Sequence, residues 1–301
     1  MGWRIICIEN AIRINYRLNS IGILNDSETI WINLDEIDTI IVETQACNTS
    51  IKLLSELAKK GISMIVCSDN HQPIGQLLSL TNNQRSAKYN KMQLEWSHES
   101  KKEMWKRIVS HKILLQMVNL YKNNKTGKID MIKEHLAQVE PGDLTNREGI
   151  VAKVYFHELF GLDFVRTRNA EDIINSSLNY IYQIVRAKIS QEIVAHGYIT
   201  SLGIFHCSEY NFFGLSDDII EVYRPILDYY VIKLVDKEKV TFMSSYYKEK
   251  LLEIMYEYIL FDNKKQKIID TISLVVISIT DSLSLQQFDN IKFPYFYDEN
   301  K

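Results

Sequence analysis

The fold class is decided by one stretch, residues 84–120, which reads QRSAKYNKMQLEWSHESKKEMWKRIVSHKILLQMVNL. From here onward apolar residues recur every three or four positions, which is the period of a helix with one buried face. Upstream, short β-branched runs alternate with turn residues, a pattern typical of strands. The change of period predicts an α+β chain of two domains. These are a small β-rich N-terminal domain with one helix over 1–83 and a larger all-helical C-terminal domain over 84–301.

The same patterns predict individual elements. One helix should begin after Asn48-Thr49-Ser50 and end at Gly61, because Ser is a frequent N-cap and Gly a frequent C-cap. With only 4 Pro and 11 Gly in 301 residues, little interrupts long helices further along the chain. Strands are expected over 3–8, 11–18, 28–32, 37–43, 62–67 and 73–80, and C-terminal helices over 87–120, 131–136, 147–160, 172–196, 217–235, 244–258 and 265–282.

Cysteine usage and hydropathy indicate the compartment. The four cysteines are isolated, without a Cys-x-x-Cys pair, which is typical of free thiols in a reducing cytosol. The first residues, MGWRIICIEN, lack the basic and apolar blocks of a signal peptide. The most apolar run, Ile268–Ile279, contains Asp270 and is too short to span a bilayer. We therefore expect a cytoplasmic protein without a membrane partner.

Charge is distributed unevenly along the chain. The total of −3 argues mildly against a nucleic-acid-binding protein. Residues 84–128 nevertheless hold eleven basic side chains against three acidic ones, a local charge of +8 that is able to neutralise phosphates. The segment is either a solvated helix face or a surface that holds nucleic acid, and the sequence leaves both readings open.

Three short stretches carry residues suited to chemistry, and each also has an ordinary structural interpretation. Thr145-x-x-Glu148 matches a capping box, which would place Glu148 at a helix start for local reasons. His206 follows aromatic Phe205, and a histidine beside aromatic residues is more often a hydrogen-bonded core residue than a ligand. Asp218 and Glu221 share one helix face among apolar neighbours, where they need a cation or a counterion such as Arg224.

Taken in order, these stretches resemble the motifs of the CRISPR-associated integrase of spacer acquisition, the family numbered one in the Cas series. The resemblance covers essentially the whole chain, and the wording of LNYIYQIV and DDIIEVYRP is most similar to the type II branch. The matching motifs are Glu148 followed by Ala152, Tyr155 and Phe156; Asn175-x-x-Leu178-Asn179-Tyr180; Gly203-x-x-His206; and Asp218-x-x-Glu221 leading into Arg224-Pro225.

The resemblance implies a metal site made of Glu148, His206 and Glu221, with Asp218 as a supporting or alternate ligand. Two carboxylates and one imidazole suit Mn²⁺ and accept Mg²⁺. The implied reaction is attack by the 3′-hydroxyl of an incoming DNA fragment on a phosphodiester at the edge of a CRISPR repeat. Water in place of the hydroxyl gives metal-dependent endonuclease activity. No covalent protein nucleophile is required.

The resemblance also implies partners. The working unit would be a homodimer held largely by the β domains, with two dimers flanking a dimer of a small companion Cas protein in a 4:2 complex on double-stranded DNA. In type II systems a DNA-end-binding ring protein and the RNA-guided effector nuclease also take part. Candidate DNA contacts, each equally open to an ion-pair or packing role, are Arg147, Arg166, Arg168, Arg186, Lys101, Lys102, Lys106, Asn179 and Tyr180.

Two rival functions are compatible with the same residues. A catalytically silent DNA-binding scaffold would use the basic segment and would bind DNA in a salt-sensitive way without product. A metal-dependent phosphohydrolase of small nucleotides would need a closed pocket, and the sequence has no Gly-rich phosphate loop to support it.

Overall fold

The computed structural model describes residues 2–26, 28–69, 73–79, 83–167 and 172–297. The chain forms two compact units, one of Met1–Tyr89 with Ser190–Tyr198 and one of Asn90–Ile189 with Ile199–Lys301. The first unit thus ends later than the predicted 83, because the ring of Tyr89 packs on that of Tyr198 with 5.3 Å between centroids.

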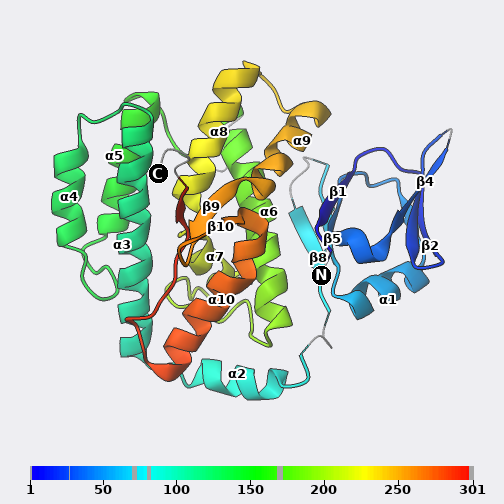
Figure 1. The fold of residues 1–301 in the computed structure, drawn as a ribbon, viewed down its shortest axis with the longest axis horizontal. Coiled ribbons are helices and arrows are strands. Elements are labelled where there is room, and N and C mark those ends of the chain that lie inside the picture. The colour runs from blue at the N-terminus through cyan, green and yellow to red at the C-terminus, as the bar shows by residue number, and fades with distance from the viewer. Residues whose placement is uncertain (1, 27, 70–72, 80–82, 168–171, 298–301) are drawn as a thin grey trace. The chain divides into compact units, whose positions relative to one another are not determined.

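The N-terminal unit contains two four-stranded sheets (Figure 1). The first has the order β1-β5-β7-β8, in which β8 alone runs antiparallel, and the second has the order β4-β3-β2-β6. Isoleucine and leucine side chains from both sheets and from helix α1 form one core. The strands are β1 (Arg4–Ile8), β2 (Arg13–Arg17), β3 (Ser20–Leu24), β4 (Thr29–Asn33), β5 (Ile37–Val42), β6 (Asn48–Thr49), β7 (Ser63–Cys67) and β8 (Pro73–Leu77), with a 3₁₀ turn at Leu34–Glu36.

Helix α1 (Ile51–Lys60) has the ends that the sequence predicts. The Ser50 side chain accepts from Leu53 N, and Gly61 closes the helix at φ 70°. Strand β3 was not predicted. It follows a hairpin turn in which Leu18 and Asn19 both have positive φ, without the glycine that usually marks such a turn. Leu80, the last residue of the final predicted strand, lies outside the described residues.

The second unit is mostly helical, and α3 is its central helix. Helix α3 contacts α4, α5, α8 and α10, and α4 and α5 lie beside it (Figure 1). The predicted helix over 87–120 is two helices, because Ser97 begins α3 by accepting from Ser100 N. The helices are α2 (Ser86–Leu94), α3 (His98–Lys122), α4 (Ile129–Ala137), α5 (Arg147–Phe160), α6 (Ile173–Ala195), α7 (Gly214–Ile220), α8 (Arg224–Glu238), α9 (Ser245–Glu253) and α10 (Ile268–Leu285).

The prediction of an all-helical C-terminal part is wrong in one region. Helix α9 ends at Glu253, a 3₁₀ turn follows at Ile254–Tyr256, and a three-stranded antiparallel sheet of order β10-β9-β11 comes next. Asp262 and Asn263 form the turn between two of its strands, at φ 50° and 60°. The strands are β9 (Tyr258–Phe261), β10 (Lys264–Lys267) and β11 (Tyr295–Phe296).

Helix α10 is the one described helix that is long and apolar enough to cross a membrane by length and composition. It has 18 residues and a mean hydropathy of 1.7. It therefore extends beyond Ile268–Ile279, the apolar run that is too short to span a bilayer. More than half of it is buried inside the protein, including Ile272, Val276 and Ile279. A helix that is buried to this extent inside the protein is typical of a core helix.

Candidate active site

Glu148 stands in the first turn of α5, and its side chain does not serve the helix end. Asn146 is the N-cap and accepts from Gly149 N, while Asp143 accepts from the backbone N–H groups of both Arg147 and Glu148. The capping box suggested by the sequence therefore does not form, and Thr145 Oγ1 accepts from Arg147 Nε instead. The Glu148 carboxylate is left available for long-range contacts.

Lys112 of α3 is the partner of that carboxylate. Its side chain is only 6% exposed and forms ion pairs with Glu148 Oε1 and with Glu221 Oε2, the latter at 2.6 Å. Burial lowers the pKa of Lys112, but the charges of Glu148 and Glu221 outweigh burial and raise it above its ordinary value. The lysine is thus an ammonium held between two carboxylates.

Lys112 belongs to the basic segment of residues 84–128, and its place in this site was not predicted. A signal was present, since Lys112 lies in the apolar run HKILLQMVNL and has no acidic residue within four positions to pair with along the helix. A lysine of that kind needs a partner from another element.

Glu221 lies in the turn that links α7 to α8 and is almost fully buried. Its Oε1 atom is 3.1 Å from Arg224 Nε, so Arg224 is the counterion that the sequence suggested. Burial raises the pKa of Glu221, but the charges of Arg224 and Lys112 outweigh burial and lower it overall. Oε2 is buried and lies 2.6 Å from Lys112 Nζ.

His206 is positioned by Asp218. Asp218 is fully buried, and its two oxygens accept from Ile204 N at 2.5 Å, Phe205 N at 3.1 Å, His206 N at 3.1 Å and His206 Nδ1 at 2.7 Å. The imidazole is 39% exposed, so it does not point into the core. Burial lowers the pKa of His206, but the hydrogen bond and charge of Asp218 raise it overall. With Nδ1 bound to Asp218, Nε2 is the nitrogen left for a ligand.

Two glycines allow this loop to approach α7 closely. A β carbon at Gly214 would lie 2.4 Å from the His206 carbonyl oxygen, and one at Gly203 would lie 2.8 Å from the same atom and 2.9 Å from Asp218 Oδ2. Neither position has room for a side chain.

The three predicted ligands are linked in two ways: two of them contact the same lysine, and the third is affected by the charge of one of them. Glu148 and Glu221 meet on Lys112, and Glu221 acts on the pKa of His206. Asp218 uses its oxygens on the loop and the imidazole, which favours Glu221 over Asp218 as the ligand. Two carboxylates and one imidazole are ligand types that suit a divalent cation. Among the described residues, however, the donor atoms of Glu148, His206 and Glu221 do not all lie within 4.8 Å of one another.

A cavity of about 520 Å³ adjoins these residues. Its walls include aromatic rings, and its polar lining includes Lys112, Glu148 and Arg224 of the site together with Lys153 and Arg166. The cavity thus combines apolar surface with cationic groups able to hold a phosphate.

Asp228, which also lines the cavity, is a buried carboxylate that was not predicted as a site residue. It accepts from Tyr155 Oη at 2.9 Å and from Tyr182 Oη, and Asn119 Nδ2 reaches Tyr155 Oη at 2.5 Å. Burial raises the pKa of Asp228 to about 6, against the effect of the two tyrosine hydrogen bonds. The network joins α3, α5, α6 and α8 next to the site.

The arginines predicted to contact DNA are differently placed. Arg166 lines the cavity, donates to Asn175 Oδ1 and lies over the Tyr182 ring. Arg147 reaches His135 Nδ1 at 3.0 Å, and Arg186 pairs with Asp217 at 3.5 Å. Arg168 lies outside the described residues. Of the candidate lysines, Lys101, Lys102 and Lys106 are each half-buried on α3.

Asn179 and Tyr180 do not have the surface that a DNA contact requires. Tyr180 is 3% exposed and Asn179 is 7% exposed, and Asn179 Nδ2 donates to Thr167 O. Both side chains pack within the protein, so this placement does not support their predicted contact with DNA.

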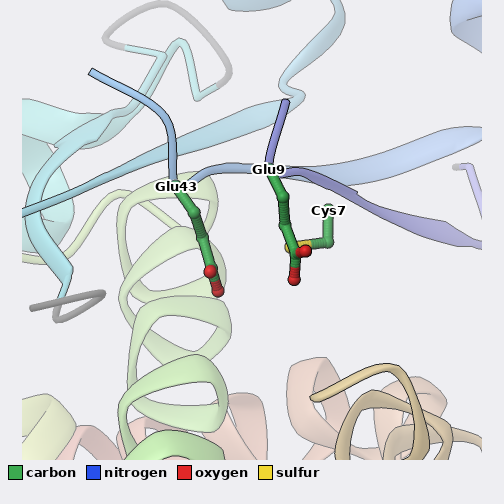
Figure 2. Close-up of side chains that lie close together, drawn as sticks. All are labelled: Cys7, Glu9 and Glu43. Atoms are coloured by element: carbon green, nitrogen blue, oxygen red, sulfur yellow. The ribbon is translucent and has the colours of Figure 1, made fainter. Parts of the chain in front are cut away.

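A second group of metal-type donors lies in the N-terminal unit. Cys7, Glu9 and Glu43 come from the carboxyl ends of the parallel strands β1 and β5, and their donor atoms lie within 4.8 Å of one another (Figure 2). Neither Cys7 nor Glu43 lacks a partner in the protein. We assign this cluster no function.

Comparisons with known proteins agree with the motifs. A family model described as CRISPR associated protein Cas1 matches residues 5–273. Over 295 residues, 98% of this chain and 96% of the relative, the chain is 30% identical to the CRISPR-associated endonuclease Cas1 of Neisseria meningitidis serogroup C (strain 8013). The fold is similar to that of a casposase bound to integration product, with a TM-score of 0.79, 17% identity and coverage of 95% of this chain and 92% of that one. It is also similar to a chain of a Cas6-RT-Cas1–Cas2 complex, with a TM-score of 0.78, 15% identity and coverage of 100% of this chain and 36% of that one.

Proposed function

The chain belongs to the Cas1 family of CRISPR-associated proteins, and from that premise we propose that it is a metal-dependent DNA integrase and endonuclease. In the proposed reaction the 3′-hydroxyl of an incoming DNA fragment attacks a phosphodiester at the edge of a CRISPR repeat. Two such strand transfers insert a new spacer, and water as the nucleophile gives DNA cleavage at the same site.

One observation carries the proposal. Glu148 and Glu221 are 73 positions apart in sequence, yet their carboxylates meet on one buried cationic group. Holding a half-buried carboxylate beside a buried one is costly unless a cation lies between them. A site that gathers negative charge in this way, beside an imidazole oriented by Asp218, is suited to binding a metal ion.

Glu148, His206 and Glu221 are the proposed ligands of a bound Mn²⁺ or Mg²⁺. Such a cation supplies Lewis-acid polarisation of the phosphate and offsets charge in the transition state. Asp218 holds the proton of His206 on Nδ1, which directs the lone pair of Nε2 outward. Arg224 keeps Glu221 in place, and the cationic side chains of the cavity would bind the DNA backbone.

The proposed partners follow from the family and from the assemblies in which similar folds are found. A similar chain belongs to a Cas6-RT-Cas1–Cas2 complex, and a similar casposase is bound to an integration product. We propose that this protein acts in the cytoplasm on double-stranded DNA, as a homodimer joined through its β-rich part. Two such dimers would bind a Cas2 dimer in a 4:2 complex, joined in a type II system by the ring protein and the effector nuclease.

Strand transfer by ligand variants tests the proposal. Glu148→Gln, His206→Ala and Glu221→Gln should each lower Mn²⁺-dependent joining of a 3′-hydroxyl DNA end to a repeat-containing target by more than about 100-fold. Glu158→Gln, on the far end of α5, is the matched control and should retain activity. Retained joining by all three ligand variants would refute the proposed site.

The behaviour of the wild-type protein distinguishes a DNA-binding scaffold from an enzyme. If it binds DNA in a salt-sensitive way but yields no cleaved or joined product with Mn²⁺ or Mg²⁺, the protein is a DNA-binding scaffold and not an enzyme.

A further inference from the structure

Lys112 is the group at the centre of the site that the proposed chemistry does not use. It lies between the two carboxylates that are the proposed metal ligands, and it is almost completely removed from water. An ammonium in such a place is stable only with compensating negative charge. Its position is therefore tied to Glu148 and Glu221 and to no other acidic partner among the ion pairs of the described residues.

We propose that Lys112 is a positioning residue that holds the place of the divalent cation in the metal-free protein and is displaced when the metal binds. This inference rests on the proposed function, since it concerns the same two ligands. In the metal-free state the ammonium keeps the carboxylates together against their mutual repulsion. In the metal-bound state the same ammonium would repel the incoming cation, so it must move away.

Two features make that displacement feasible. Lys112 lines the cavity of about 520 Å³, which gives its flexible side chain space to enter once its contacts with Glu148 and Glu221 are broken. Glu221 keeps a counterion after the movement, because Arg224 contacts the other carboxylate oxygen.

Under this proposal, loss of the Lys112 charge should lower the stability of the metal-free protein and raise its affinity for metal. Lys112→Met keeps a flexible unbranched side chain of nearly the same length and removes its charge, which leaves the buried Glu221 and the half-buried Glu148 without their shared cation. The metal-free variant should unfold at a lower temperature than wild type. Because no ammonium then has to be displaced, the variant should bind Mn²⁺ about tenfold more tightly or better.

The experiment uses Mn²⁺ alone, with free metal measured by electron paramagnetic resonance and unfolding followed in EDTA and in saturating Mn²⁺. Lys112→Arg keeps the charge and should stay closer to wild type than Lys112→Met. Lys125→Met, an exposed position just after the same helix, is the matched control and should equal wild type in both measurements. If Lys112→Met does not fold, Lys112→Met/Glu148→Gln, which also removes one carboxylate, should recover the fold, and failure to recover it would overturn the proposal.

The outcomes distinguish failure of the proposed Lys112 role from failure of the proposed metal site. Mn²⁺ binding by Lys112→Met that is equal to or weaker than wild-type binding would overturn the role of Lys112 while leaving the proposed metal site intact. No Mn²⁺ binding by either protein would overturn the metal site and the role of Lys112 together. Tighter binding combined with lower metal-free stability is the result that we expect.

Discussion

Replacing Asp218 with asparagine should destabilise the His206 loop strongly, although the two side chains have the same shape. Asp218 Oδ1 accepts from His206 N and Nδ1, and Oδ2 accepts from Ile204 N and Phe205 N. Asparagine keeps one oxygen and presents an NH₂ group in place of the other. If the NH₂ group replaces Oδ2, it faces the N–H donors of Ile204 and Phe205. If it replaces Oδ1, it faces His206 N, and His206 Nδ1 keeps its contact only by giving up its proton and accepting.

The expected loss of unfolding free energy follows from those contacts. At least one hydrogen bond to a buried charged group is lost, worth about 1.5–3 kcal/mol, so the substitution should cost at least that much. Asp217→Asn is the matched control on the same helix. Asp217 accepts from Asn211 at 3.0 Å and pairs with Arg186 at 3.5 Å, so its substitution should cost about 1 kcal/mol or less.

Urea unfolding at neutral pH in EDTA measures the difference between the two variants, and hydrogen exchange at residues 204–206 shows whether the loss is local to the loop. Asp218→Asn should also weaken Mn²⁺ binding, because His206 either loses its Nδ1 contact or carries its proton on Nε2, where the ligand lone pair is needed. A difference in unfolding free energy below about 1 kcal/mol, with unchanged exchange at these amides, would refute the reasoning.

Further expectations concern the backbone and the buried acid. Gly214→Ala should destabilise the protein by about 2 kcal/mol or more in urea unfolding, because its β carbon would lie 2.4 Å from the His206 carbonyl oxygen. Gly75→Ala, whose nearest such contact is 3.9 Å away, should change stability by less than about 1 kcal/mol. Burial raises the pKa of Asp228 from 3.8 to about 6, so the folded protein holds a proton that the unfolded chain releases. Stability should therefore fall as pH rises from about 4 through about 6, and urea midpoints of Asp228→Asn should lack this fall. Tyr155→Phe removes a hydroxyl that donates to Asp228 at 2.9 Å, so the fall should extend to higher pH and stability at neutral pH should drop by about 1–3 kcal/mol.

Elements governed by local rules were predictable from the chain. Helix α5 has the bounds that the 3.6-residue period indicated, and α1 begins at Ser50 and ends at Gly61 as its capping residues indicated. Both features depend on residues within one or two turns, so the sequence contains all the information that decides them.

The hairpins show where local rules were insufficient. Strand β3 follows the turn Leu18-Asn19, and β10 follows the turn Asp262-Asn263, both with positive φ at each central residue and neither with glycine. Strand β10 is the polar tetrapeptide KKQK, which has little intrinsic preference for a strand. Its pairing with β9 supplies the hydrogen bonds, and that pairing is a property of the folded unit.

The sequence by itself determined the family, the order of strands before helices and the residue types of the site. Only the tertiary structure decided what each of those residues does. Glu148 was equally compatible with a helix cap until Asp143 was found to take the backbone donors, and Lys112 belonged to a basic segment until packing buried it between Glu148 and Glu221. The physical reason is that the residue type defines the charge of a side chain, whereas its partner and its exposure to water depend on elements that are distant along the chain.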